Sequence, residues 1–101
     1  MELAVVQGSV VATVKADKLK GRKLLILNIA GPDAKPTNTF VVAVDTVGAG
    51  EGEMVLLVRG SSARQSSDLA SVPTDASIIA VVDAIEWNGR TVFKKEKQGR
   101  S

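Results

Sequence analysis

Short runs of β-branched and aliphatic residues alternate with breaks rich in glycine, proline and polar residues, and long helical periodicity is missing. This pattern is typical of a protein built from short strands. We expect five main strands, at residues 3–14, 23–29, 40–45, 53–59 and 78–85. Gly8 lies in the middle of the first run and predicts a bulge or a sharp bend, as barrel corners require. The second run is apolar at almost every position, which predicts burial on both of its faces.

The breaks between these runs predict loops and one short helix. Pro32 and Pro36 argue against regular pairing in residues 30–39, so we expect a loop there. Residues 61–65 are expected to open a short helix with a serine as its N-cap, and residues 66–77 to form a polar loop.

The pair Asn88-Gly89 is the preferred sequence of a type I′ turn, and it predicts a hairpin that follows the fifth strand. Five strands, a bend in the first one and little helix indicate an all-β protein with a small closed or nearly closed barrel. We expect one domain at residues 1–93, made of the barrel and its C-terminal hairpin. Residues 94–101 are expected to form a basic flexible tail.

The composition fits one small domain. The chain has 101 residues, of which 45% are hydrophobic, and Phe40, Phe93 and Trp87 are its aromatic residues. This is enough for one modest core and leaves no room for a second domain. A domain of this size still exposes much apolar surface, and oligomerisation is a natural way to bury it.

The chain contains neither cysteine nor histidine. Disulfides, thiolate metal sites and cysteine nucleophiles are therefore excluded, and so are the commonest general base and the commonest metal ligand. Asp45 and Asp83 each follow an apolar run, where aspartates usually accept hydrogen bonds from nearby backbone amides, so we interpret both as structural. We expect no catalytic residue, no metal, no cofactor and no enzymatic activity.

The net charge of +2 is unevenly distributed. Residues 94–101 hold four cations and one anion, so the tail carries +3 and the rest of the chain sums to −1. Such a tail on a near-neutral body is more often a solvated terminus than a nucleic-acid surface. No apolar run is long enough to span a membrane, and the N-terminus lacks the pattern of a signal peptide. We expect a cytosolic protein without membrane contact.

Three glycines lie within five residues in the connection between the third and fourth strands. A phosphate cradle would need a helix directly after the glycines, and a strand is expected there instead. The segment is then either an ordinary turn or a tight loop that packs against a neighbouring subunit or lines a narrow opening. This candidate pore or inter-subunit loop consists of Gly48, Ala49, Gly50, Glu51 and Gly52. If Gly50 adopts a positive φ, valine at this position would damage the assembly.

A second candidate site follows the fourth strand. A serine nucleophile would need an adjacent base, and nothing in the sequence indicates one. The segment is either a helix cap with one solvated arginine or part of an assembly interface, in which the arginine binds a carboxylate or a carbonyl. The residues are Gly60, Ser61, Ser62, Ala63 and Arg64.

Five segments together resemble the EutN/CcmL family of bacterial microcompartment vertex proteins. The strongest single element is the run Ala-Val-Asp-Thr-Val-Gly-Ala-Gly at residues 43–50. The order and spacing of the segments make the resemblance specific, and it covers the chain up to about Ile85. The five segments are residues 8–15, 19–25, 43–53, 60–64 and 75–83.

The resemblance implies an OB-like β-barrel that assembles into a homopentamer and caps the vertices of a polyhedral shell. Hexameric shell proteins are then its expected neighbours, and the shell in the cytoplasm is its expected location. A cyclic ring needs a heterologous interface, in which one surface of a subunit docks a different surface of the next. The resemblance favours subunit contacts at residues 48–52 and 60–64. Residues 48–52 could also line an axial opening, where an inward-pointing Glu51 would disfavour anions.

The alternative function is that of an OB-like protein that binds single-stranded nucleic acid. Such proteins stack bases on exposed aromatic residues in a basic groove. This chain has few aromatic residues and its excess charge is confined to the tail, so we expect no specific nucleic-acid binding. The hairpin at residues 87–93 and the tail could contact shell neighbours or cargo, or could be a solvated end.

Overall fold

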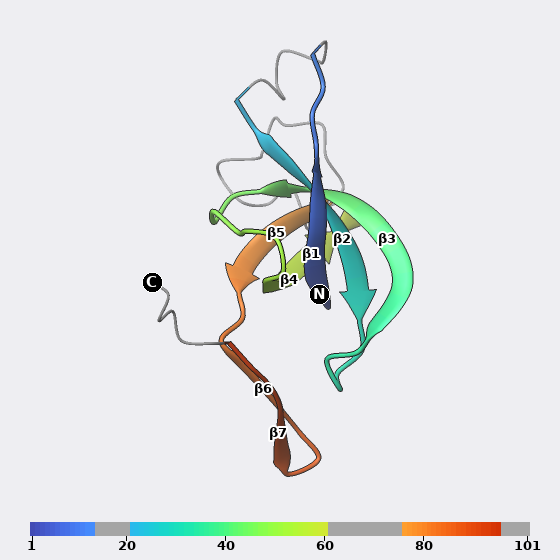
Figure 1. Ribbon diagram of the computed structural model, residues 1–101, viewed down its shortest axis with the longest axis vertical. Helices are drawn as coiled ribbons and strands as arrows, with labels where there is room; N and C mark the ends of the chain where they lie inside the picture. Colours follow the sequence, from blue (N-terminus) through green and yellow to red (C-terminus); the bar gives the residue numbers. More distant parts are fainter. Residues whose placement is uncertain (14–20, 61–75, 96–101) are drawn as a thin grey trace.

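Seven β-strands make up the secondary structure of the computed structural model, which describes residues 1–13, 21–60 and 76–95 (Figure 1). Five of them form a closed barrel and two form a separate hairpin. The barrel strands are β1 (Glu2–Val10), β2 (Lys23–Ala30), β3 (Pro36–Asp45), β4 (Met54–Arg59) and β5 (Ala76–Val81). The hairpin strands are β6 (Ala84–Trp87) and β7 (Arg90–Lys94).

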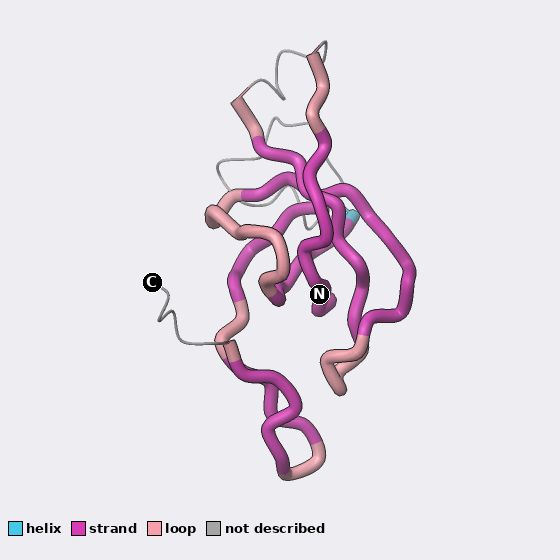
Figure 2. Tube along the Cα trace, viewed as in Figure 1, coloured by secondary structure: helices cyan, strands magenta, loops and turns pink. Residues whose placement is uncertain are grey.

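The barrel closes in the order β1-β2-β3-β5-β4, because β4 pairs with both β5 and β1. Every neighbouring pair is antiparallel except β3 and β5, which share two parallel residue pairs, Val44 with Ser77 and Asp45 with Ile78. Figure 2 shows how the strands wrap around one another while the hairpin extends from one end of the barrel. The expected five-stranded barrel with a C-terminal hairpin is confirmed.

The expected bulge in the first strand is also present. In β1 the register with β2 shifts between Val6, which pairs with Leu27, and Gly8, which pairs with Ile26. The extra residue, Gln7, is exposed. A bulge of this kind bends its strand and increases the local twist, which helps a short sheet to close into a barrel.

The third strand begins earlier than the sequence indicated. We expected a loop through residue 39, but β3 starts at Pro36, which pairs with Ala30 at the end of β2. The prediction is wrong here because proline is tolerated as the first residue of a strand, where its missing N–H is not needed. Asn38 has a φ of 67°, and its N–H donates to the side-chain oxygen of Asn28 at 2.8 Å, within the irregular part of the β2–β3 ladder.

The fifth strand ends earlier than expected. It stops at Val81, and Ile85 belongs to the hairpin, where it pairs with Phe93. The turn of the hairpin is as predicted, because Asn88 and Gly89 have φ values of 56° and 79°, both positive as a type I′ turn requires.

The core fills the inside of the barrel. One buried cluster contains inward-facing residues from all five barrel strands, and Ala49 joins it from the connection between β3 and β4. The largest fully buried apolar side chains of the barrel are Leu27, Leu57, Ile78, Val6, Val44 and Val55. Because Ala49 is part of this cluster, the glycine-rich loop is anchored in the core.

Candidate functional site

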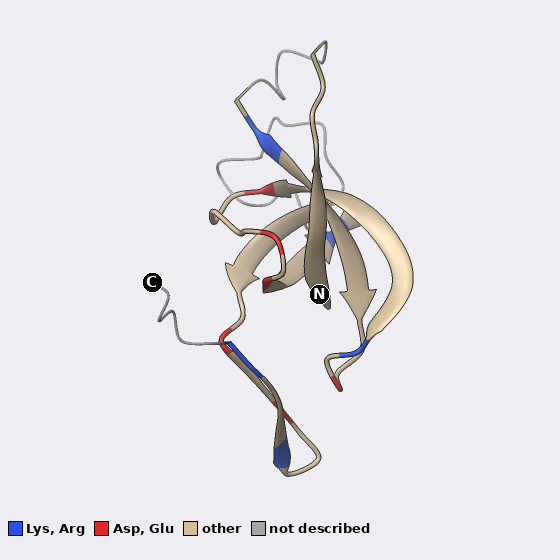
Figure 3. Cartoon of the chain, in the orientation of Figure 1, with Lys and Arg blue, Asp and Glu red and all other residues tan. Residues whose placement is uncertain are grey.

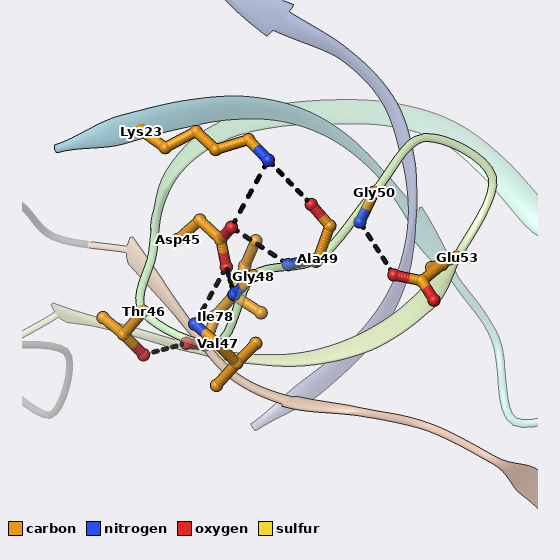
Figure 4. Close-up of polar contacts among 9 residues, drawn as sticks. All are labelled: Lys23, Asp45, Thr46, Val47, Gly48, Ala49, Gly50, Glu53 and Ile78. Carbon is orange, nitrogen blue, oxygen red and sulfur yellow. Dashed lines mark hydrogen bonds and ion pairs between the residues drawn. The ribbon is translucent and has the colours of Figure 1, made fainter.

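The loop at residues 46–53 begins on a carboxylate that is almost completely buried. Asp45 ends β3, and its side chain is 2% exposed. Its Oδ1 accepts hydrogen bonds from the backbone N–H groups of Val47 and Gly48 at 3.0 and 3.1 Å (Figure 4). Its Oδ2 accepts one from the N–H of Ala49 at 3.0 Å. Asp45 therefore satisfies three successive loop amides, which confirms the structural role predicted for it.

A lysine from the neighbouring strand holds the same part of the loop. Lys23 pairs with Asp45 in the β2–β3 register, and its Nζ donates to the carbonyl oxygen of Ala49 at 3.1 Å. The Nζ lies 3.9 Å from Oδ2 of Asp45, but the lysine side chain is 57% exposed, so water weakens this ion pair. On the other side, the Thr46 hydroxyl donates to the carbonyl of Ile78 at 2.8 Å. The loop start is thus tied to both β2 and β5.

The second half of the loop is a tight turn. The N–H of Glu53 donates to the carbonyl of Gly50 at 3.1 Å, and Gly52 has a φ of 86°. This hydrogen bond with a positive φ at the third residue is the pattern of a type II turn. Gly48 also has a positive φ, of 79°. Gly50 is not among the residues with positive φ, so the reason we expected valine to fail there is wrong.

Glu53 links the turn to the C-terminal hairpin. Its Oε1 accepts a hydrogen bond from the N–H of Gly50 at 2.7 Å, and its Oε2 lies 3.1 Å from Nζ of Lys95. The hydrogen bond from the Gly50 amide is the main reason why the pKa of Glu53 is lowered, and the Lys95 ammonium lowers it further. Burial has a smaller, opposite effect and raises the pKa. The backbone of Glu53 also accepts from the N–H of Val6 at 2.9 Å, which ties the turn to β1.

The loop is exposed on both sides of Ala49, which is fully buried. Thr46, Val47 and Gly48 are exposed at its start, and Glu51 and Gly52 are exposed at its tip. Glu51 borders two surface hollows. One, of about 450 Å³, lies between residues 51–54 and 93–95, and the other, of about 240 Å³, lies beside the β1 bulge and Lys23. The loop is therefore held by hydrogen bonds at its start and at its turn, and Glu51 is the charged side chain at its exposed tip.

The second candidate site is only partly described. Gly60 directly follows β4 and has a φ of 70°. Ser61, Ser62, Ala63 and Arg64 lie outside the described residues, as does the helix expected at residues 61–65. The structure therefore places Gly60 at the end of a barrel strand, and the interface predicted at residues 60–64 stays a prediction.

Two residues that hold the loop were not found by sequence reasoning. Lys23 could have been found from the strand register, since it opens the run that pairs with the run ending in Asp45. Lys95 lies 42 residues beyond Glu53, and no local pattern links the two. In the described part of the chain there is no group of three acidic residues that could hold a metal ion. No helix among the described residues is long and apolar enough to cross a bilayer.

The family profile described as "Ethanolamine utilisation protein EutN/carboxysome" matches residues 1–83. The chain belongs to the EutN/CcmL family. The shell vertex protein EutN of Escherichia coli is 43% identical over 94% of this chain and 100% of its own length. This result confirms the family proposed from the sequence.

Solved structures of family members have the same fold. CcmL of Gloeobacter violaceus, a carboxysome shell vertex protein, superposes with a TM-score of 0.89 at 36% identity and covers 94% of this chain and 98% of its own. GrpN of Rhodospirillum rubrum, a pentameric microcompartment shell protein, is 45% identical with a TM-score of 0.78 and covers 86% of this chain and 99% of its own. These relatives have a structural role, which supports the shell interpretation over nucleic-acid binding or enzymatic activity.

Proposed function

We propose that five copies of this chain close into a ring that caps a vertex of a bacterial microcompartment shell, with hexameric shell proteins around it. The observation that carries the proposal is the similarity to the pentameric shell protein GrpN, at 45% identity over 99% of that protein. A closed polyhedral shell needs such five-fold units, because a sheet of hexagonal tiles cannot close by itself.

The glycine-rich loop is a suitable contact element in this ring. Asp45, Lys23 and Glu53 fix the backbone of the loop within one chain, so little conformational entropy is lost when its tip meets a partner. We assign residues 48–52 to a subunit contact or to the lining of an axial opening, and residues 60–64 to a second assembly contact. Support for the first assignment is the exposure of Glu51 and Gly52 at the tip of a loop anchored in the core.

The ring is tested by native mass spectrometry of the purified chain at near-physiological salt. A dominant species of five subunits is the expected result. A stable monomer over the micromolar range would contradict the proposed ring, and the family relationship would then indicate a shared fold only.

The neighbours are tested by co-expression with a hexameric shell protein. With the chain present we expect closed polyhedral particles in electron micrographs, and without it open sheets or tubes. If the particles have the same shape in both cases, the vertex role is wrong even where the pentamer itself is observed.

A further inference from the structure

The outer wall of the barrel carries little charge and several exposed apolar side chains. An antiparallel sheet with one face in water normally alternates apolar and polar residues, so that the outward positions are polar. Here the barrel strands carry no acidic or basic residue between their ends, and Figure 3 shows the charges gathered at strand ends and in loops. The uncharged stretches are residues 3–13, 24–32, 36–44, 54–58 and 76–82.

One flank of this wall is formed by β2 and β3. Phe40 is 53% exposed and Val42 is 50% exposed, on the side of β3 opposite to the buried Ala43. Val42 pairs with Ile26 of β2, which is half-buried and also points away from the core. Side chains directly opposite each other on one face of an antiparallel pair are in contact, so Val42 touches Ile26. Phe40 lies on the same face, opposite the polar Asn28, and extends this apolar surface along β3. We call it the β2–β3 flank.

A second apolar surface lies on β4 and β5. Leu56 and Val58 alternate with the buried Leu57, so they point outward, and both are half-buried. Ile79 of β5, at the bulge in the β4–β5 ladder, is 38% exposed. We call these three residues the β4–β5 flank.

The positions of the two flanks fit a ring. In a cyclic ring each subunit meets two neighbours through two different surfaces. The barrel order places β1 between β2 and β4, so β1 separates the two flanks on one side of the barrel, while on the other side β3 and β5 are direct neighbours that share two residue pairs at the end of β3. The absence of charge also fits, because the centres of protein interfaces are depleted of charged residues and enriched in aromatic ones such as Phe40.

We propose that the β2–β3 flank of one copy packs against the β4–β5 flank of the next copy in the ring. The inference rests on the proposed pentamer and adds which surfaces of the barrel meet. A second copy is the occupant because the pentameric relative GrpN matches 86% of this chain, and because a ring supplies one partner for each of the two flanks.

Charge substitutions in the full-length chain test the inference. Phe40→Asp and Ile79→Asp should each shift the population from pentamer to monomer by at least tenfold at micromolar concentration in native mass spectrometry. Val11→Asp is the matched control, because Val11 is 92% exposed and lies just beyond the end of β1. It should leave the pentamer intact. Circular dichroism should show an unchanged barrel in all three variants, since none of these residues is part of the buried core.

The outcomes separate this inference from the proposed function. A wild-type chain that is not pentameric overturns the proposed function itself. A pentameric wild type whose Phe40→Asp and Ile79→Asp variants also remain pentameric overturns only the assignment of the flanks. If these variants stay pentameric but fail to enter shells, the flanks contact a different shell protein and the inference is wrong.

Cross-linking gives a second test that does not depend on weakening the ring. The chain has no cysteine, so introduced thiols are the only ones present. The double variant Phe40→Cys with Ile79→Cys, treated with a short thiol-reactive cross-linker, should give a ladder of covalent oligomers that ends at five. Either single variant should give no ladder, because residue 40 of one copy faces residue 79 of the next. A double variant that remains monomeric on a denaturing gel, while its native mass is that of a pentamer, contradicts the proposal.

Discussion

The carboxylate of Glu53 accepts a 2.7 Å hydrogen bond from the backbone N–H of Gly50, while the N–H of Glu53 donates to the carbonyl of Gly50 at 3.1 Å. The two residues therefore close the glycine-rich turn through both backbone and side chain. Both contacts lie within one chain, so the shape of the turn is fixed before any copy of the protein meets another. The loop therefore has the same shape before and after assembly, and the stability of the loop can be measured in the isolated subunit.

Replacing Glu53 with glutamine should weaken the pH dependence of stability. The folded-state pKa of Glu53 is lowered, chiefly by the Gly50 amide and then by Lys95, so its contribution is present above the unfolded-state value near 4.5. That contribution is lost as the pH falls through the folded-state pKa. Urea unfolding should show a smaller loss of stability from pH 7 to pH 3 in Glu53→Gln than in the wild type.

The charge-matched control for this experiment is Glu51→Gln. It removes a carboxylate from the exposed tip of the same loop and leaves the contacts of Glu53 with Gly50 and Lys95 in place. It should unfold like the wild type at both pH values. Equal pH dependence in the wild type and in Glu53→Gln would show that the Gly50 and Lys95 contacts do not stabilise the folded chain.

Replacing Asp45 with alanine should be one of the most damaging changes outside the core. It would leave three backbone N–H groups of the loop without their acceptor, in a place where the aspartate side chain is 2% exposed. Hydrogen bonds to a charged group contribute about 1.5 to 3 kcal/mol each, but the opened loop can recover some of this from water, so we expect a loss of about 3 kcal/mol. Asp45→Asn should lie between alanine and wild type in denaturant unfolding. A loss below about 0.5 kcal/mol for Asp45→Ala would contradict the anchoring role.

The three glycines of the loop should respond differently to alanine. Gly48 and Gly52 have φ values of 79° and 86°, and a left-handed conformation costs a non-glycine residue about 1 to 2 kcal/mol. A Cβ at either position would meet nothing within 4 Å, so the cost is conformational and not a clash. At Gly50 the Cβ would lie 3.7 Å from Oε1 of Glu53, an ordinary contact, and we expect a much smaller effect. Thermal unfolding of the three variants tests this order, and equal melting temperatures would refute it.

The ion pair between Glu2 and Arg59 should matter less than its short distances suggest. Arg59 donates from Nε at 2.7 Å and from Nη2 at 2.9 Å to the two carboxylate oxygens, joining the start of β1 to the end of β4. These hydrogen bonds lower the pKa of Glu2, but both side chains are partly exposed, at 34% and 44%. We expect Glu2→Gln to reduce the free energy of unfolding by less than about 1 kcal/mol, and less still at high salt. A salt-independent loss above 2 kcal/mol would mean that the pair is effectively desolvated.

Most of the strand pattern could be predicted because it depends on local signals. Gly8 marks the bulge, and Asn88-Gly89 marks the hairpin turn, since few other residues adopt the backbone conformations needed there. The loop predicted around Pro36 was wrong because the effect of a proline depends on its position, and only the observed pairing with Ala30 places Pro36 at the start of a strand. The positive φ considered for Gly50 was wrong for a related reason, because the sequence cannot tell which glycine of a cluster has a positive φ.

The fold class and the family could be read from the chain before folding, and so could the lack of cysteine and histidine, because these depend on residue types, their order and their local spacing. How the loop is held could be seen only in the folded molecule. Lys23, Asp45, Glu53 and Lys95 meet there only because β1, β2 and the hairpin base lie next to the β3–β4 connection in space. The fold also determines which apolar residues face outward. Successive residues of a strand point to opposite faces of the sheet, and closure of the barrel puts Leu27 in the core and Val42 on the outside.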